Sequence, residues 1–235
     1  MVLGGTCKIG VLGGIGPEAT GEFYNKLITE LQVRELINNN QDFPQIIINS
    51  IPAPELIGNK ISEKDLENYI SGLRELHNFE VDFIVMVCNT IHLFHDKFQK
   101  RINTTILDLK EEIKKFLIKN NIQKVLVIGT PLTIKGGLYE FQEISSFKPN
   151  EKELETLSKA IFNFNKGFKK EEQIKITKKI CEKYLEKGAK KIILGCTEFA
   201  VMLGKKNLPN INTIDLLVDA TIKKFILTKA KGDIL

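Results

Sequence analysis

Short apolar runs alternate along this chain with stretches in which apolar residues recur every three or four positions. The short runs are typical of buried strands and the longer spacing is typical of amphipathic helices. The runs predict strands at 8–12, 46–51, 83–87, 104–107, 125–128, 192–194 and 212–214, with a weaker strand at 143–147. The spacing predicts helices at 17–33, 63–79, 92–101, 109–120, 151–166, 170–187, 197–204 and 216–228. The alternation indicates an α/β fold with parallel sheets covered by helices on both faces.

The second half of the chain repeats features of the first. The run KIGVLG at 8–13 is echoed by KVLVIG at 124–129, and INTTILD at 102–108 is echoed by INTID at 211–215. We therefore expect two similar Rossmann-like parallel-sheet domains. Open parallel sheets of α/β proteins bind ligands beyond the carboxyl ends of their strands. We therefore expect the active site in the cleft between the two domains, at these strand ends.

The repeat also predicts where the domains divide. The second unit begins with a helix just after residue 108, and the last helix has no strand after it. That helix is expected to pack back on the first half. The first α/β domain would then comprise residues 1–108 plus 216–235, and the second residues 109–215.

Each half carries one cysteine at the end of a strand and before a threonine. Cys88 stands in VMVCNTIH and Cys196 in IILGCTE. Two thiols at matched positions predict one site that they both face. Backbone N–H groups at the start of a following helix would lower the thiol pKa below its usual value of about 8.5. Cys7 and Cys181 lack this context and are expected to be inert buried residues.

The stretch GGIGPEA at 13–19 superficially resembles a dinucleotide fingerprint, but no acidic residue closes the second strand. The glycines fit better as room for backbone to approach a small substrate, although a tight turn without ligand would look the same. His92 and His95 have no apparent third metal ligand, so solvent-facing or helix-surface histidines are favoured over a metal site. The alternative for His92 is that it orients the Cys88 region or stabilises charge there. Asp108 and Asp215 are expected to cap the helices that follow them.

Composition narrows the classes of partner. The net charge of +5 comes from 34 basic and 29 acidic residues that alternate along the helices, and the chain has no Trp. These features argue against nucleic acid and suit an anionic small molecule. There is no apolar run of about 20 residues and no secretory signal pattern, so we expect no membrane segment and a cytoplasmic protein.

Three motifs together carry a family resemblance. GGIGPEAT at 13–20, CNTIH at 88–92 and GCTE at 195–198 resemble, in order and spacing, motifs of the aspartate/glutamate racemase superfamily. Within it, the chain is most similar to the cofactor-independent aspartate racemase family. The resemblance implies a fold of two domains related by a pseudo-twofold, a homodimer, and an amino-acid or dicarboxylate substrate. It also implies activity without pyridoxal phosphate or a metal. The implied reaction interconverts the L and D forms of an acidic amino acid, aspartate first and glutamate second.

The resemblance also implies a role for individual residues. Cys88 and Cys196 would be the two acid/base groups on opposite faces of the substrate Cα, where two bases need no movement to invert the centre. The residues implied to hold the α-carboxylate are Asn89, Thr90, Thr130 and Thr197. Lys166 falls where the family has a lysine that meets a substrate carboxylate.

One departure keeps other substrates and reactions open. Aspartate racemases usually carry an arginine shortly after the second strand, but NSIPAPE at 49–55 has none. A lysine would not reproduce the bidentate geometry of that arginine, so glutamate or a less acidic amino acid remains open. Maleate cis-trans isomerisation, which also uses two cysteines, is an alternative reaction. Arylmalonate decarboxylases resemble this fold but have one of the two cysteines, so the presence of both here counts against decarboxylation. Hydantoin racemisation and a non-catalytic protein that binds acidic amino acids are further alternatives.

Overall fold

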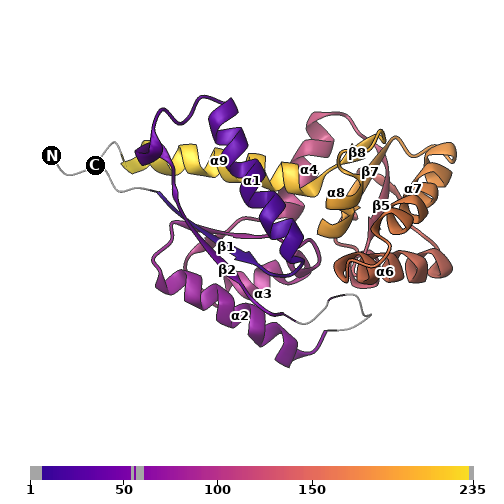
Figure 1. The fold of residues 1–235 in the computed structure, drawn as a ribbon, viewed down its shortest axis with the longest axis horizontal. Coiled ribbons are helices and arrows are strands. Elements are labelled where there is room, and N and C mark those ends of the chain that lie inside the picture. The colour runs from indigo at the N-terminus through magenta and orange to yellow at the C-terminus, as the bar shows by residue number, and fades with distance from the viewer. Residues whose placement is uncertain (1–6, 54–55, 57–60, 233–235) are drawn as a thin grey trace.

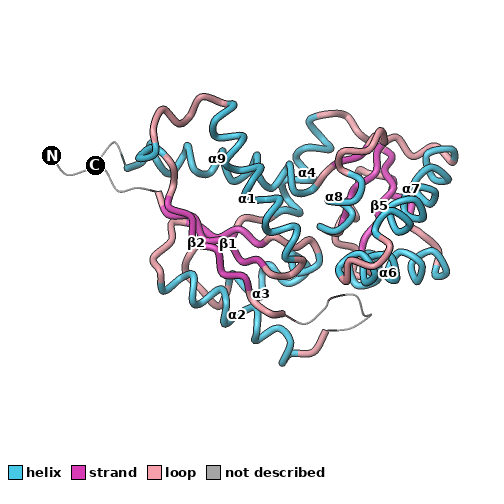
Figure 2. The backbone as a smooth tube through the Cα atoms, viewed as in Figure 1, coloured by secondary structure: helices cyan, strands magenta, loops and turns pink. Residues whose placement is uncertain are grey.

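The structure is a computed structural model that describes residues 7–53, 56 and 61–232. Within these residues the strands form two separate parallel sheets (Figure 2). The first sheet has the order β2-β1-β3-β4, from β1 (Lys8–Gly13), β2 (Gln45–Ser50), β3 (Phe83–Met86) and β4 (Thr105–Ile106). The second has the order β6-β5-β7-β8, from β5 (Lys124–Gly129), β6 (Ser145–Phe147), β7 (Lys191–Gly195) and β8 (Asn210–Ile211).

The two sheets share one topology, because in each the second strand lies at one edge and the first strand next to it. This arrangement confirms the predicted α/β fold and its internal repeat. The central strands β1, β3, β5 and β7 are almost wholly buried, as expected for parallel strands covered on both faces.

Helices flank both sheets in the described part of the chain. They are α1 (Pro17–Val33), α2 (Glu63–Asn78), α3 (His95–Gln99), α4 (Leu109–Lys119), α5 (Pro131–Lys135), α6 (Glu151–Asn165), α7 (Lys170–Glu186), α8 (Thr197–Leu203) and α9 (Thr213–Gly232). Two 3₁₀ segments accompany them, η1 (Asn40–Asp42) and η2 (Thr90–Phe94). None of these described helices has the length and apolar character needed to span a bilayer.

The predicted elements are mostly present, with two differences among the helices. The segment predicted as one helix over 92–101 is divided into η2 and the short α3. The short α5 was not expected. Its first residue is Pro131, and the Thr130 hydroxyl caps it by accepting the Thr133 N–H at 3.1 Å.

The start of α9 corrects two sequence predictions. The strand expected at 212–214 is wrong, because β8 ends at Ile211 and α9 begins at Thr213. The Asn212 side chain accepts the backbone N–H groups of Ile214 at 2.9 Å and Asp215 at 3.4 Å, so Asn212 and not Asp215 caps this helix. The matching prediction for Asp108 is confirmed, since it accepts the Lys110 N–H at 2.9 Å.

Helix α9 joins the two halves of the molecule. It begins beside the second sheet and runs along α1 and α4 (Figure 1). Two ion pairs attach it to α1: Lys26 pairs with Asp215, and Arg34 Nη1 lies 2.9 Å from Asp219 Oδ1. One apolar cluster also contains core residues of both sheets, among them Val85 and Leu194. The two sheets are therefore held in one packed body.

We expect the Asn212→Ala substitution to lower the free energy of unfolding by about 1 kcal/mol, because it removes the side chain that caps α9. The matched variant Asp215→Ala should change it by less than about 0.5 kcal/mol, because its exposed pair with Lys26 contributes little. Urea denaturation of the two variants and the wild type measures both values. Equal losses in the two variants would contradict this assignment of the cap.

Candidate active site

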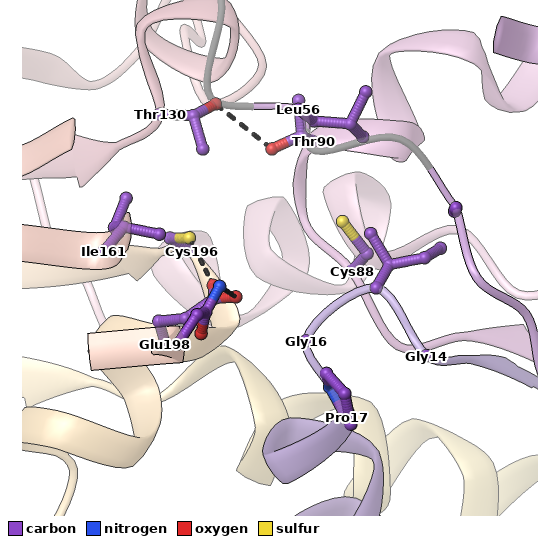
Figure 3. A pocket seen from close by; sticks show the side chains of 13 residues that line it. Gly14, Gly16, Pro17, Leu56, Cys88, Thr90, Thr130, Ile161, Cys196 and Glu198 are labelled. Carbon is purple, nitrogen blue, oxygen red and sulfur yellow. Dashed lines mark hydrogen bonds between the residues drawn. The ribbon is translucent and has the colours of Figure 1, made fainter. Parts of the chain in front are cut away.

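The carboxyl ends of the central strands of both sheets meet at one pocket of about 210 Å³. Figure 3 shows side chains from both halves around this space. The lining residues are Gly14, Ile15, Gly16, Pro17, Ala53, Leu56, Cys88, Thr90, Thr130, Ile161, Asn165, Cys196 and Glu198. The pocket is smaller than the 300–1,000 Å³ or so that is typical for drug-sized ligands, which suits a molecule of amino-acid size.

The two motif cysteines line this pocket together. Cys88 follows β3 and Cys196 follows β7 directly, so the repeat places them at equivalent strand ends. Their sulfur atoms lie on opposite sides of the pocket and are turned toward the space between them (Figure 3). Both residues are buried, with exposed fractions of 6% and 5%.

The expectation of a lowered thiol pKa is wrong for both cysteines. Burial raises the pKa of Cys88 to about 12, and the backbone N–H groups of Ile91 and Thr90 offset only part of this effect. Burial also raises the pKa of Cys196 well above its usual value, and the neighbouring Glu198 carboxylate raises it further. The thiolate is disfavoured because removal from water costs more than these few backbone donors return.

Glu198 is a pocket residue to which sequence reasoning assigned no role. The Cys196 thiol donates a hydrogen bond to Glu198 Oε2 at 2.7 Å, and Asn165 Nδ2 donates to Oε1 at 3.1 Å. The carboxylate is 8% exposed. Its position two residues after Cys196, in the GCTE motif, could have predicted a role in the site. The role was missed because an acidic residue in the first turn of any helix is favourable for the helix alone.

The glycine-rich segment after β1 closes against this carboxylate. Gly16 has φ 90°, and a Cβ there would lie 2.8 Å from Glu198 Oε1. Gly14 has φ 83°, and a Cβ there would lie 2.4 Å from the Ile51 carbonyl oxygen. Both positions therefore need glycine, for their positive φ and for close approach to other parts of the chain. Their predicted role in admitting a small substrate stays a prediction.

Three threonine hydroxyls form a cluster beside the cysteines. Thr90 Oγ1 lies 3.2 Å from Thr130 Oγ1 and 2.9 Å from Thr133 Oγ1. Thr90 and Thr130 line the pocket, so the cluster brings neutral hydrogen-bond donors from both halves to it (Figure 3).

The other predicted binding residues lie outside the lining of the pocket. Asn89 is buried behind it, donating to Thr213 Oγ1 at 3.0 Å and accepting from the Tyr139 hydroxyl. Thr197 is buried and donates to Glu198 Oε2 at 3.3 Å. Lys166 is exposed at the end of α6, with Nζ 4.0 Å from the centre of the Phe162 ring.

His92 is buried, with an exposed fraction of 3%, so its predicted place on a helix surface is wrong. Nδ1 accepts the Leu109 N–H at 3.4 Å, which leaves the proton on Nε2 to donate to the Met86 carbonyl oxygen at 3.3 Å. Burial lowers the pKa of His92 to about 4. The ring is therefore neutral at neutral pH and ties the end of β3 to the start of α4. In the part of the chain that is described, no three His, Cys, Asp or Glu side chains are grouped to hold a metal ion.

The stretch that lacks the expected arginine borders the pocket. Ala53 and Leu56 line it, whereas Pro54 and Glu55 lie outside the described residues. Among the described lining residues there is no Lys, Arg or His, and Glu198 is the one charged side chain.

Known proteins with related sequences include amino-acid racemases. The broad specificity amino-acid racemase RacX of Bacillus subtilis (strain 168) is 32% identical over 133 residues, covering 56% of this chain and 58% of RacX. The glutamate racemase of Aquifex pyrophilus is 33% identical over 146 residues, covering 57% of this chain and 54% of that protein. The matches thus span little more than half the length of these relatives.

Solved structures with the same fold cover nearly the whole chain. Picrophilus torridus aspartate racemase superposes with a TM-score of 0.77 at 22% identity, covering 93% of this chain and 94% of that one. An aspartate racemase homologue from Pyrococcus horikoshii OT3 superposes with a TM-score of 0.69 at 25% identity, covering 95% of this chain and 99% of that one. The family model described as Asp/Glu/Hydantoin racemase matches residues 12–221, from the first strand into the last helix. The chain therefore belongs to the Asp/Glu/hydantoin racemase family.

Proposed function

We propose that this chain is an isomerase that racemises a free amino acid without a cofactor, with Cys88 and Cys196 as its two acid/base groups. The observation that carries the proposal is the pair of thiols on opposite sides of one pocket (Figure 3). Family membership supports the reaction class, and the related proteins named above are racemases of aspartate, of glutamate or of a broad range of amino acids.

In the proposed reaction one cysteine is a thiolate and the other a thiol. The thiolate removes the proton from the substrate Cα, and the electron pair of that C–H bond moves toward the carboxylate. The opposite thiol then delivers its proton to the other face of the carbon. The two sulfurs have exchanged protonation states, so the next turnover begins from the opposite side.

The charges around the thiols explain how a thiolate forms despite burial. Before substrate binds, burial keeps both groups protonated, and Glu198 further disfavours a thiolate at Cys196. The ammonium group of an amino acid brings a positive charge into the pocket, and a nearby positive charge lowers a thiol pKa. Substrate binding thereby favours the base that the reaction needs.

The threonine cluster supports a site for the α-carboxylate. Hydroxyls of Thr90 and Thr130 can donate to its oxygens and stabilise the charge that develops there when the Cα proton leaves. The α-carboxylate roles of Asn89 and Thr197, and the carboxylate contact of Lys166, rest on the resemblance and stay predictions. Asn89 also supports the pocket wall through Thr213 and Tyr139.

We also propose that the molecule divides as expected from the repeat, into residues 1–108 plus 216–235 and residues 109–215. The packing of α9 on α1 supports this division, because it returns the end of the chain to the first half. A homodimer stays a prediction from the resemblance, as does the acidic substrate, with aspartate favoured over glutamate.

The activity is tested by incubating purified protein with a panel of L-amino acids in heavy water, without an added cofactor. We expect the D enantiomer to form on chiral chromatography and the Cα proton signal to disappear by NMR. Conversion of maleate to fumarate without any racemisation would instead support the isomerase alternative. Thermal stabilisation by amino acids with no change in configuration would support a binding protein.

We expect Cys88→Ser and Cys196→Ser each to lower the rate of racemisation by about 10²–10⁴-fold or more, because each removes one acid/base group. A single variant can still exchange the Cα proton of one enantiomer with solvent, since one thiol remains. Chiral chromatography measures the first effect, and deuterium incorporation into each enantiomer measures the second.

Cys181→Ala is the matched control, because Cys181 is fully buried within α7 and does not line the pocket. It should keep nearly wild-type turnover. Racemisation at a nearly wild-type rate in either pocket variant would disprove the two-base mechanism.

We expect Glu198→Gln to lower the pKa of Cys196, because an adjacent carboxylate opposes the thiolate. The sign follows from charge: a neutral amide no longer repels the thiolate, so alkylation of Cys196 should begin at lower pH. The measurement is the iodoacetamide reaction rate against pH in a Cys88→Ser background, with peptide mapping. Glu18→Gln, an exposed change near the same pocket, is the control. An unchanged or higher midpoint in Glu198→Gln would contradict the coupling.

A further inference from the structure

The charge of the pocket lining restricts the substrates that the proposed racemase can bind, and the inference below rests on that proposed function. Among the described lining residues, Glu198 alone carries a formal charge, and it is negative. The carboxylate is held in place by Asn165 and by the Cys196 thiol, so it stays directed at the pocket (Figure 3). The site thus offers a partner for one positive group and neutral donors for one carboxylate.

An amino acid with an uncharged side chain matches this set of groups. Glu198 is available to pair with its ammonium group, and the hydroxyls of Thr90 and Thr130 are available to donate to its carboxylate. A second carboxylate has no cationic partner among the described lining residues, because the one charged lining group, Glu198, is negative and is already paired with the ammonium group. Burial of an unpaired charge is costly, so an acidic side chain binds poorly here.

The ammonium groups of two lysines near the pocket contact groups outside its lining. Lys166 follows the lining residue Asn165 but rests over the Phe162 ring, 4.0 Å from its centre. Lys170 pairs with Glu18, the residue after the lining Pro17, and lies 4.5 Å from the centre of the Phe164 ring. Neither lines the pocket, so neither supplies the missing positive charge in this arrangement.

An apolar surface is available for the substrate side chain on the side of Cys88. Ile15 and Leu56 are buried members of one apolar cluster that also contains Cys88, and Ala53 packs against it. All three line the pocket, and together they form what we call the apolar wall. Contact with such a surface favours aliphatic or small side chains, because it removes apolar area from water.

We propose that the preferred substrates are amino acids with uncharged side chains, bound with the ammonium group at Glu198 and the side chain against the apolar wall. The proposal departs from the acidic substrate that the resemblance implies. It explains in one step why the arginine expected after β2 is absent, since an uncharged side chain needs no cation.

The test is to measure kcat/KM of the full chain for L-alanine, L-serine, L-methionine, L-aspartate, L-glutamate and L-lysine. We expect at least one uncharged amino acid to exceed all three charged ones by about tenfold or more, in line with the cost of a poorly paired charge. A highest value for aspartate, glutamate or lysine would overturn the proposal but leave the racemase function intact. Failure of every amino acid to racemise would instead reject the proposed function and this proposal with it.

A second measurement separates binding from chemistry. In the double variant Cys88→Ser with Cys196→Ser, thermal stabilisation by each amino acid reports affinity without turnover. The uncharged amino acids should stabilise this variant more than aspartate and glutamate do. Larger stabilisation by the acidic pair would contradict the proposed charge matching.

The position of the side chain is tested with Ala53→Arg against the matched variant Ala53→Met, which adds similar bulk without charge. An arginine in the apolar wall can bind a side-chain carboxylate through two hydrogen bonds. We expect the ratio of kcat/KM for aspartate to that for alanine to rise about tenfold or more in Ala53→Arg relative to Ala53→Met. An equal ratio in the two variants would overturn the placement of the side chain against this wall.

Discussion

The pocket exists because two parallel sheets direct their carboxyl ends at a common space and are held there by shared packing. The apolar cluster that contains Val85 and Leu194 joins the cores beneath the two cysteines, and α9 packs along α1. A rotation of one sheet relative to the other would separate Cys88 from Cys196. The chemistry of the site therefore depends on this interface before it depends on any single side chain.

Burial of the two thiols at that interface disfavours the thiolate and also makes the thiols more sensitive to nearby charge. The pocket places two thiols, a carboxylate and several hydroxyls together, and burial raises the pKa of both thiols, which disfavours a thiolate. The same low polarity strengthens the response of the thiols to a substrate that carries positive charge. Glu198 is central to both effects, because it bonds Cys196 and is the charged group offered to a ligand by the described lining residues.

Local pattern was enough to predict most elements, and the errors have identifiable physical causes. The predicted strand at 212–214 was wrong because the sequence Asn-Thr-Ile does not by itself reveal that Asn212 caps the next helix. The predicted surface position of His92 was wrong because its spacing resembles an exposed helix position, whereas η2 turns it inward against Met86 and Leu109. The lowered thiol pKa was wrong because a strand-end motif shows nearby N–H donors but not the depth of burial.

From the sequence alone came the α/β class, the repeat, the pair of matched thiols and the family resemblance, because periodicity and motif spacing are properties of the chain itself. The sequence also predicted that the two thiols share one site. Only the tertiary structure decided that Glu198 bonds Cys196 and that Lys166 lies outside the lining. These features depend on contacts between residues far apart in the chain. The charge of a binding site is set by the side chains that folding brings together, and the overall composition does not show which residues those are.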